Sequence, residues 1–336
     1  MVRASVPCRV DFGGTLDIST FFLALAAHSP STFNIALDLR TCVTLTPYRP
    51  GQVKISSRGF ETAEFERGNA PFNHPMGLMF SVVNYFDGHG VHVHIESSSP
   101  PKSALGGSSS AAVAMISAFL HALDQPKDPA AIAWLAHYLE ASVAGVPCGM
   151  QDQLAAAFGG VNQWVWTMGE VAPVFEQRTI FKGPGQTAAF NEHLLVAYCG
   201  VPHVSRDVNG QWVRSFIKGE SRHQFQTIAR LTREFVRALE AQDFERAGDL
   251  MNQETQTRLE MTPDVLDNTG KLCFDAARSC GCGARFTGAG GGGCLWAIGP
   301  KTGVEQLRPV WQKILSRIET AQILQTQIED KGIIIS

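Results

Sequence analysis

Apolar and polar positions alternate in the first hundred residues, which predicts short strands separated by turns. The stretch GVHVHIESSSP at 90–100 alternates for several residues, and His92 and His94 lie on one face of it. Two histidines at this spacing can bind a metal ion, but strand alternation alone explains the same pattern, so we expect no metal there. Further strands are expected over 4–12, 41–49 and 52–59.

Helical periodicity begins after this region. Residues 76–86 form a helix candidate, and residues 109–123 are apolar nearly all round, which predicts a buried helix. The breaker stretch DQPKDP precedes a second helix, for which Asp128 is a suitable N-cap and Pro129 a suitable first residue. A turn and a short helix of small residues follow, and this helix ends at a Gly-Gly pair.

The pattern changes near residue 190. A strand candidate at 193–201 and a polar loop at 200–212 lead into two long amphipathic helices, and a third helix follows Pro263. The stretch CGARFTGAGGGGCLWAIG reads as strand, glycine turn and strand. The remaining elements are expected at 219–241 and 243–260 for the long helices, near 301–318 for a last helix, and at 326–336 for a terminal strand.

A length of 336 residues suits two domains of about 150–180 residues each. The Gly/Pro-rich stretch FKGPGQ lies near residue 185, so we expect domains over 1–185 and 186–336. Strands and helices occur in both parts, which predicts an α+β fold.

Composition restricts the classes of partner. Hydrophobic residues make up 44% of the chain and charged residues 18%, as in an ordinary globular protein. The formal net charge of −3 argues against a binder of nucleic acid or of anionic membranes. No apolar run approaches the roughly 20 residues of a membrane span, and the N-terminal stretch shows no secretion signal. Eight cysteines form no CxxC pair, which favours reduced thiols and a cytoplasmic protein.

The stretch PPKSALGGSSSAAV at 100–113 reads as a loop that opens into a helix. Backbone N–H groups of a glycine-rich turn at a helix N-terminus form an anion site, and the helix end adds about half a positive charge. A phosphate cradle and a structural Gly/Ser turn explain the stretch equally well. It is not a Walker A loop, because GxxxxGK[ST] does not occur in the chain.

Two carboxylates bracket a second turn. Glu140 precedes Asp152 by twelve residues, and the intervening GVPCGM could fold Asp152 back toward Glu140. Phosphoryl transfer to a hydroxyl uses one carboxylate to bind the metal and another to orient and deprotonate the nucleophile. A surface glutamate and a helix-capping aspartate would give the same sequence, so spacing alone does not assign a function.

The glycine run in RFTGAGGGGCLWAI contains a GxGxxG match at Gly288, Gly290 and Gly293. A dinucleotide-binding motif of this kind opens a helix, whereas a strand candidate follows here. We therefore reject a Rossmann dinucleotide-binding motif here. A nucleotide-binding oxidoreductase stays an alternative, which the absence of any required nicotinamide would exclude.

Three motifs in this order, PCRVDFGGTLD, ALGGSSSAA and FTGAGGGGC, make the chain resemble the GHMP kinase superfamily, which includes galactokinase, homoserine kinase and mevalonate kinase. The joint match runs from residue 7 to residue 294. The resemblance implies a two-domain GHMP-kinase-like fold with the active site in the cleft between the domains. Within the superfamily, GMQDQLAAAFGGVN is most similar to the sugar-kinase branch, namely heptose-phosphate, fucokinase-like and galactokinase-like enzymes.

The resemblance implies roles for residues of these motifs. Asp152 matches the aspartate that orients and deprotonates the acceptor hydroxyl, and Arg9 matches the basic residue beside it. Glu140 and Ser108 match the two protein ligands of Mg²⁺. The residues implied to hold the phosphates of ATP are Leu105, Gly106, Gly107, Ser108, Ser109 and Ser110.

The resemblance also implies a substrate side. Asp17 falls where sugar kinases bind substrate hydroxyls, and Asp11 is a second candidate in the same motif. The turn at 287–293 is implied to close over the acceptor. The full expected set is Asp11, Gly14, Asp17, Arg206, Gly290 and Gly291.

Two features depart from the family pattern. Asp17 lies eight residues after Arg9, whereas sugar kinases usually have nine, so the loop that recognises the substrate is shorter by one residue. Lys102 and Ala104 stand where relatives commonly have glycine. Lys102 either adds a cation beside the triphosphate or points into solvent, and we favour solvent.

The resemblance therefore predicts a kinase that uses ATP and Mg²⁺ to phosphorylate a hydroxyl of a sugar or sugar phosphate. A non-sugar acceptor, either mevalonate-like or an amino alcohol, is one alternative, and a catalytically inactive ligand sensor is another. We expect a monomer or homodimer without a nucleic-acid or membrane partner.

Overall fold

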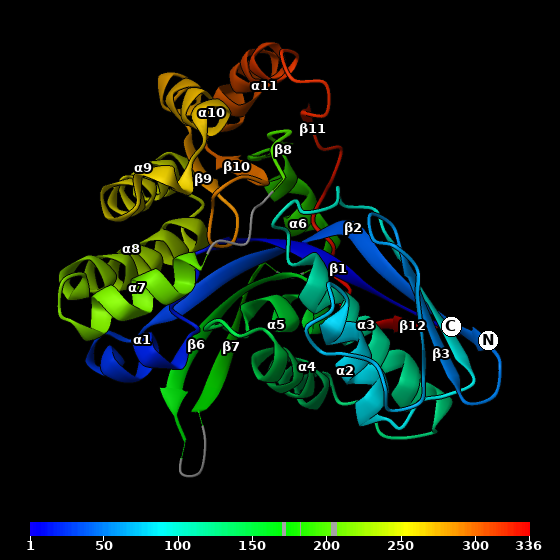
Figure 1. Ribbon diagram of the computed structural model, residues 1–336. Coiled ribbons are helices and arrows are strands. Elements are labelled where there is room, and N and C mark those ends of the chain that lie inside the picture. The colour runs from blue at the N-terminus through cyan, green and yellow to red at the C-terminus, as the bar shows by residue number, and fades with distance from the viewer. Residues whose placement is uncertain (170–172, 182, 203–206) are drawn as a thin grey trace.

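A computed structural model describes residues 1–169, 173–181, 183–202 and 207–336. Its first half, which is the N-terminal part of the chain together with the C-terminal strand β12, is built on an eight-stranded sheet (Figure 1). Its strands are β1 (Val2–Phe12), β2 (Ser31–Pro47), β3 (Gln52–Ser57), β4 (Ala63–Glu66), β5 (Val91–Ser97), β6 (Val161–Met168), β7 (Pro173–Phe181) and β12 (Ile334–Ile335). The strand order is β12-β1-β2-β5-β3-β4, and β6 and β7 extend the sheet from the other end of β2. Within the described residues these strands pair antiparallel, apart from the parallel pair β3 and β5.

Helices cover one face of this sheet. The central helix α3 packs directly on β1 and β2, because its sequence is apolar on nearly every side. Around it lie α2, α4 and α5, and the short α1 and η1 follow β1. Their bounds are α1 (Ser19–Ala24), η1 (Ala26–His28), α2 (Gly77–Tyr85), α3 (Gly107–Ala122), α4 (Pro129–Val143) and α5 (Gln151–Phe158).

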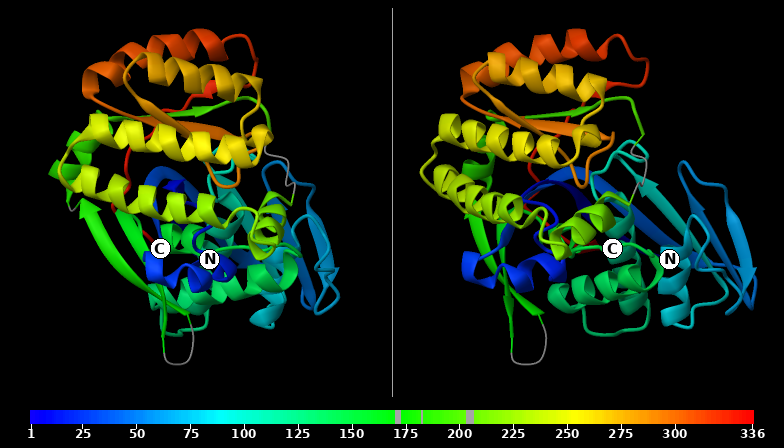
Figure 2. Two further views of the ribbon diagram at one scale, coloured as in Figure 1. Left: turned by 90° about the vertical axis from the view of Figure 1, so that its left-hand side faces the viewer. Right: turned by 60° about the vertical axis from the view of Figure 1, so that its left-hand side comes forward.

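The second half is a three-layer unit. A four-stranded antiparallel sheet has the order β11-β8-β10-β9, with bounds β8 (Leu194–Tyr198), β9 (Gly283–Phe286), β10 (Cys294–Ile298) and β11 (Gln322–Ile323). Figure 2 shows one pair of long helices on the side of this sheet that faces the first half and a second pair on the opposite side. The helices are α6 (Pro184–Asn191), α7 (Val208–Ile217), α8 (Arg222–Glu240), α9 (Phe244–Met261), η2 (Pro263–Val265), α10 (Asn268–Ser279) and α11 (Lys301–Leu315).

The two halves share a hydrophobic core. Phe12 of β1 stacks on Phe235 of α8 with ring centroids 4.1 Å apart, and Trp296 of β10 belongs to the same buried cluster. Aromatic contacts of this kind hold β1 against the second sheet. The domain boundary expected at residue 185 stays a prediction.

The C-terminal residues return to the first sheet. Ala4 of β1 lies opposite Ile335 of β12, and Arg3 and Ser336 exchange two backbone hydrogen bonds of 2.9 and 2.8 Å. Arg40 also donates to the carbonyl of Gly332 at 2.6 Å. The edge of β1 is therefore covered by the end of the chain.

The expected architecture and one expected helix cap are confirmed. The mixed α+β architecture is present, and Asp128 caps α4 by accepting a 2.8 Å hydrogen bond from the N–H of Ala131. The eight cysteines are free, and five of them are buried. No helix in the described part of the chain is both long and apolar enough to cross a bilayer.

Other expectations are wrong in detail. The polar loop expected at 200–212 contains the start of α7, because Asp207 caps the first turn and Val208, Trp212 and Phe216 form a buried stripe. The hairpin of β6 and β7 was not expected. Of the terminal strand expected at 326–336, β12 comprises the two residues Ile334–Ile335.

Candidate active site

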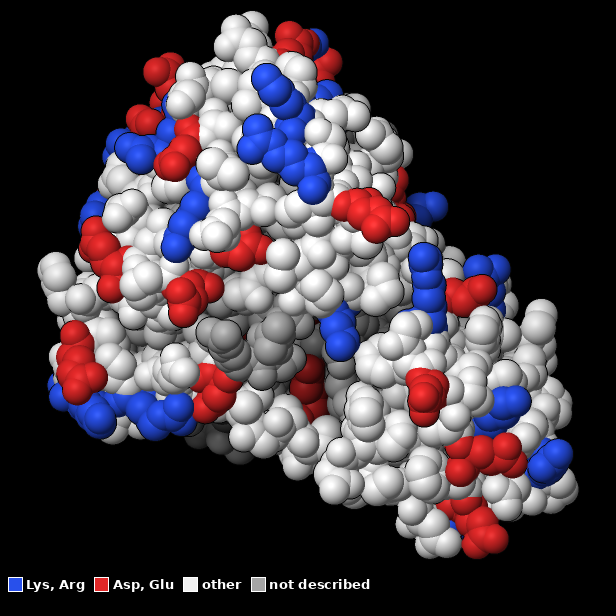
Figure 3. All heavy atoms as spheres, turned by 45° about the horizontal axis from the view of Figure 1, so that its top comes forward, with Lys and Arg blue, Asp and Glu red and all other residues white. Residues whose placement is uncertain are grey.

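A cavity of about 730 Å³ lies where the two halves meet. The first half contributes the start of α3, the start of α5 and the turn after β1, and the second half contributes Pro202, Asn209, Gly288 and Ala289. Figure 3 shows the surface hollowed between the two halves, with an acidic side chain visible inside the hollow. The predicted catalytic and metal-binding residues Arg9, Asp152, Glu140 and Ser108 line this cavity.

The buried Arg9 forms an ion pair in the cavity with Asp152, which is partly buried. Nε of Arg9 donates to Oδ1 of Asp152 at 2.8 Å, and Nη2 lies 2.7 Å from the same oxygen. Nη1 donates to the carbonyl of Ala104 at 2.8 Å, just before α3. Burial alone would lower the pKa of the Arg9 guanidinium, but the charges of Asp152 and Asp11 more than offset this and raise it. Arg9 therefore stays cationic beside Asp152.

Glu140 lies on the other side of the helix start. Its Oε2 accepts hydrogen bonds from the hydroxyl of Ser109 at 2.8 Å and from Nε2 of Gln153 at 2.5 Å. Burial raises the pKa of Glu140 to about 7, although the hydrogen bond from Ser109 lowers it in part. The serine that contacts Glu140 is thus Ser109, whereas Ser108 is exposed at the cavity wall.

The glycine-serine turn, residues 105–109, leads into the first turn of α3. Gly106 has a φ of 77°, a left-handed conformation that glycine adopts without strain, and a Cβ there would lie 3.2 Å from Oδ2 of Asp152. A Cβ on Gly107 would meet no atom within 4 Å. The first-turn amides of the helix lack acceptors within the helix and can bind an anion. The turn, its open space and Asp152 therefore adjoin one another.

Lys102 and Ala104 precede this turn. Both adopt left-handed backbone conformations, with φ of 55° and 60°, at positions where glycine would be unstrained. The turn is held by the bond from Arg9 to the carbonyl of Ala104 and by a 2.9 Å bond from the N–H of Cys294 to the carbonyl of Ser103. Lys102 is exposed at the cavity wall, which leaves both interpretations of its charge open.

Asp17, which is expected to bind the acceptor, lines the same cavity. Its Oδ2 accepts a 3.0 Å hydrogen bond from the N–H of Gln151, the residue before Asp152. A Cβ on Gly149 would overlap the Asp17 carboxylate, so the two segments fit closely. Burial raises the pKa of Asp17 to about 6. The hydrogen bond from Gln151 lowers this pKa in part, and the negative charge of Asp152 raises it further.

Asp17→Asn should stabilise the protein more at pH 8 than at pH 4.5. The native pKa of about 6 exceeds the ordinary 3.8, so the ionised carboxylate costs folding free energy. That cost is absent below pH 3.8, grows as the pH rises and is complete above about pH 6, where it reaches up to about 3 kcal/mol. Urea unfolding at the two pH values measures it. The exposed Asp249→Asn is the control, and an equal gain at both pH values would contradict the burial of Asp17.

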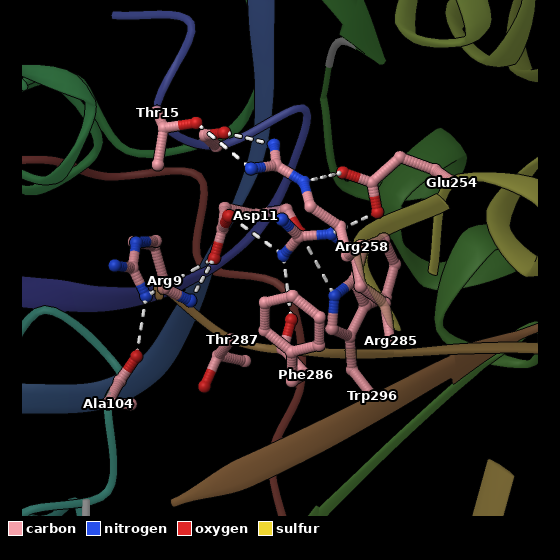
Figure 4. A network of polar contacts seen from close by, with 12 residues as sticks. Arg9, Asp11, Thr15, Ala104, Glu254, Arg258, Arg285, Phe286, Thr287 and Trp296 are labelled. Atoms are coloured by element: carbon pink, nitrogen blue, oxygen red, sulfur yellow. Dashed lines mark hydrogen bonds and ion pairs between the residues drawn. The ribbon is translucent and has the colours of Figure 1, made fainter. Parts of the chain in front are cut away.

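A buried network of charges extends from Arg9 into the second half (Figure 4). Asp11 lies 3.6 Å from Nη1 of Arg9 and 3.0 Å from Nη1 of Arg285 on β9. Arg285 in turn donates to Glu254 on α9 at 2.9 Å, and Glu254 accepts from Arg258 at 3.0 Å. Positive and negative charges alternate along this network, so each buried charge has a partner of opposite sign.

Some expected site residues lie away from the cavity wall. The carboxylate of Asp11 is buried in the network and accepts from the N–H of Gly288 at 2.7 Å. Ser110 donates its hydroxyl to the carbonyl of Pro7, and the Leu105 side chain packs in the core. Gly14, Gly290 and Gly291 lie beside residues of the cavity wall rather than in it, and Arg206 lies outside the described residues.

Two cavity residues were not anticipated from the sequence. Oε1 of Gln151 and Oδ1 of Asn209 are buried without a hydrogen-bond partner among the described residues, although both residues line the cavity. Buried polar atoms normally have partners, so a bound hydroxyl or water would fit here. Gln151 lies in the GMQDQ stretch and Asn209 in SRDVNGQWVRSFIKGE, which resembles the substrate-side loop of sugar kinases, but neither residue was singled out.

Two family models match the chain. GHMP kinases N terminal domain matches residues 73–160, and GHMP kinases C terminal matches residues 235–316. Together they cover about half of the chain, and the first contains the glycine-serine turn, Glu140 and Asp152.

Individual proteins divide between two kinds of acceptor. Mevalonate kinase of Thermococcus onnurineus is 27% identical over 327 residues, which are 89% of this chain and 90% of that protein. D-glycero-alpha-D-manno-heptose 7-phosphate kinase of Campylobacter jejuni is 29% identical over 170 residues, 48% of this chain and 49% of that protein. The crystal structure of a D-glycero-D-manno-heptose 1-phosphate kinase from Bacteroides thetaiotaomicron superposes with a TM-score of 0.76 at 17% identity, over 100% of this chain and 99% of that one. At this identity the superposition shows a common fold.

Proposed function

We propose that this chain, which belongs to the GHMP kinase family of ATP-dependent kinases, transfers the γ-phosphoryl group of ATP to a hydroxyl of a sugar or sugar phosphate. The observation that carries the proposal is the contact of Asp152 with Arg9 at the mouth of the glycine-serine turn, in one cavity. An anion site and a carboxylate paired with a buried cation are the components that phosphoryl transfer to a hydroxyl needs.

The residues present fit a nucleotide. A side chain at Gly106 would crowd Asp152, and the space in front of Gly107 is open, so the helix start is a cradle that a Cβ would obstruct. The amides of Gly107, Ser108 and Ser109 would hold the phosphates. At the other end of the same cavity, Met76 and Met79 offer an apolar wall suited to a base.

The residues also fit one magnesium ion. No group of three or more His, Cys, Asp or Glu in the described part of the chain could hold a metal by itself. Mg²⁺ usually takes one or two protein ligands and completes its octahedron with phosphate oxygens and water. Glu140 with the hydroxyl of Ser109 or Ser108 would supply that small set.

The chain's own groups would act by position and charge. ATP with Mg²⁺ supplies the phosphoryl group and neutralises part of its charge. Asp152 would accept the proton of the acceptor hydroxyl at Oδ2, because Oδ1 is occupied by Arg9. Arg9 would orient Asp152 and stabilise the charge that develops on the transferring group. The catalytic contribution is therefore orientation and electrostatics.

Side-chain oxygens that can accept hydrogen bonds line the part of the cavity that would bind the substrate, and they favour a polyol. Asp17, Gln151 and Asn209 each offer a side-chain oxygen next to the cavity, and the last two oxygens lack partners among the described residues. A sugar brings several hydroxyl donors at once, which is the complement of this lining. A carboxylate next to Asp17 would meet repulsion between like charges.

A mevalonate-like acceptor is the second candidate. It is favoured by the relatives named mevalonate kinase, which align over 89% of the chain. Mevalonate carries a carboxylate, and Arg9, the cation that contacts Asp152, is already engaged by Asp11 and Asp152. The sugar proposal therefore rests on the lining of the cavity, and the mevalonate alternative on sequence similarity.

A substrate panel tests the proposal. The chain is incubated with ATP and Mg²⁺ and with monosaccharides, sugar phosphates, mevalonate and amino alcohols in turn, and the products are separated by mass. A product 80 Da heavier than one of the sugars supports the proposal. Phosphorylation of mevalonate alone would overturn the sugar acceptor, and binding of a sugar without any ATP consumption would indicate an inactive sensor.

Glu140→Gln should raise the Mg²⁺ concentration needed for half-maximal rate by about tenfold or more, with KM for the acceptor changed less than about twofold. The amide keeps the shape of the side chain and the contact with Ser109 but removes the charge that would bind the ion. Initial rates over a Mg²⁺ series measure it, with the exposed Glu240→Gln as control. A larger change in acceptor KM than in Mg²⁺ requirement would assign Glu140 to the acceptor site.

A further inference from the structure

A buried arginine of α9 contacts the turn that carries Asp17. Nη2 of Arg258 donates to the carbonyl of Gly14 at 2.6 Å, and Nη1 donates to the hydroxyl of Thr15 at 3.1 Å (Figure 4). Arg258 is fully buried and belongs to the second half of the chain, 241 residues after Asp17 (258 minus 17). The turn that recognises the acceptor in the first half is thus held from the second half.

The turn needs such support because its backbone is strained. Thr15 has a φ of 76°, a left-handed conformation that costs a β-branched residue about 1–3 kcal/mol. The turn is closed by hydrogen bonds from the N–H of Leu16 to the carbonyl of Gly13 and from the N–H of Ile18 to the carbonyl of Thr15. Contacts from outside the turn, to the hydroxyl of Thr15 and the carbonyl of Gly14, therefore support this conformation.

The strained residue, Thr15, lies two residues before Asp17, whose carboxylate would bind the acceptor. Thr15 and Asp17 both line the cavity, and Asp17 in turn accepts the N–H of Gln151, next to Asp152. Because Asp17 fits closely against Gly149, a small displacement of the turn would move its carboxylate relative to Asp152. The conformation of Thr15 thus sets the distance between the acceptor-binding and base-carrying segments.

Arg258 itself is held on several sides. Its Nε donates to Oε1 of Glu254 at 3.0 Å, and Oε2 of Glu254 accepts from Arg285. The guanidinium also lies 4.6 Å from the ring centroid of Trp212 on α7 and 5.4 Å from that of Phe225. These contacts leave two of the three guanidinium nitrogens to the turn, in a fixed geometry that a flexible ammonium would not reproduce.

We propose that Arg258 is a positioning residue for the acceptor: it holds Thr15 in its left-handed conformation and thereby fixes Asp17 opposite Asp152. This inference rests on the proposed function, because it takes Asp17 as a residue that binds the acceptor and Asp152 as the base. It assigns acceptor affinity to a residue that contacts neither substrate.

The test is Arg258→Lys in the full-length chain. We expect KM for the acceptor to rise about tenfold or more, with KM for ATP and kcat each changed less than about threefold. The acceptor Kd, measured by calorimetry without nucleotide, should rise in parallel. The assays use whichever acceptor the wild-type chain phosphorylates, so failure of the sugar assignment and failure of the role of Arg258 give different results.

Arg40→Lys is the matched control. Arg40 also bonds backbone carbonyls and a carboxylate, at Ser5, Gly332 and Glu329, but it does not line the cavity. It should lower stability without changing acceptor KM. An equal rise in acceptor KM in both variants would reduce Arg258 to a purely structural residue.

Substitutions of Thr15 keep the test decisive if Arg258→Lys does not fold. Thr15→Val removes the hydroxyl that Arg258 bonds and should raise acceptor KM about three- to tenfold, whereas Thr15→Ser keeps the hydroxyl and should stay near wild type. Thr15→Gly relieves the strain, so combined with Arg258→Lys it should raise KM by less than the product of the separate effects. Independent, multiplicative effects, or loss of ATP affinity with acceptor affinity intact, would overturn the proposal.

Discussion

Asp152→Asn should lower kcat by about 10²–10⁴-fold, with the Kd for ATP changed less than about threefold. Asparagine preserves the size of the side chain and can still accept the bond from Arg9, but it cannot take up the proton of the acceptor hydroxyl. Since Asp152 adjoins the glycine-serine turn without belonging to it, the nucleotide cradle should remain intact. Steady-state kinetics and equilibrium binding of an ATP analogue separate the two effects.

Asp243→Asn is the matched control for this variant. Asp243 caps α9 by accepting the N–H of Arg246, a role that asparagine fills as well as aspartate. Its kcat should equal that of the wild-type chain. An undiminished rate in Asp152→Asn would remove the base assignment, and a collapse of ATP affinity would mean that Asp152 serves the nucleotide instead.

Arg9→Gln should reduce both stability and rate. Removing the guanidinium leaves Asp11 and Asp152 without this buried cation, and loss of one partner of a buried pair costs about 3–5 kcal/mol. The rate should fall by about 10²-fold or more, as expected when a preorganised charge at the reacting group is lost. The two effects are read from urea unfolding and from kcat below the unfolding transition.

The exposed ion pair of Arg178 with Glu240 supplies the comparison for Arg9. Arg178→Gln should change the free energy of unfolding by less than about 1 kcal/mol and leave kcat unchanged, because solvent screens both charges. A loss of stability in Arg9→Gln without a loss of rate would show that Arg9 is structural. A loss of rate without a loss of stability would show that Arg285 alone compensates the buried charge of Asp11.

Local patterns predicted much of the fold. The capping residue Asp128, the apolar stretch of α3 and the long amphipathic helices each declare themselves within a few turns of sequence. The hairpin of β6 and β7 and the helix α7 did not. Strand β6 has buried residues on both faces and therefore shows no simple alternation, and α7 adjoins polar residues that resemble a loop. In both cases the packing of the element in the folded chain determines its structure, and the local sequence pattern does not show it.

The candidate site was predictable only where one motif carried the chemistry. Arg9 and Asp152 belong to motifs and Glu140 precedes one of them, and the structure brings all three to one cavity, while their roles remain predictions. The pairing of Glu140 with Ser109 instead of Ser108 depends on the rotation of a helix start, which spacing does not specify. Arg258 had no signal at all, because its partners are a carbonyl and a hydroxyl more than 240 residues away.

The pairing of β12 with β1 ties the order of synthesis to the order of folding. β1 carries Arg9 and leaves the ribosome well before its outer neighbour Ile335, which emerges after the whole second half. Until then one edge of the nascent sheet is open to other strands. A chain interrupted before residue 334 would keep Arg9, Glu140 and Asp152 and lose the strand that covers the edge of β1.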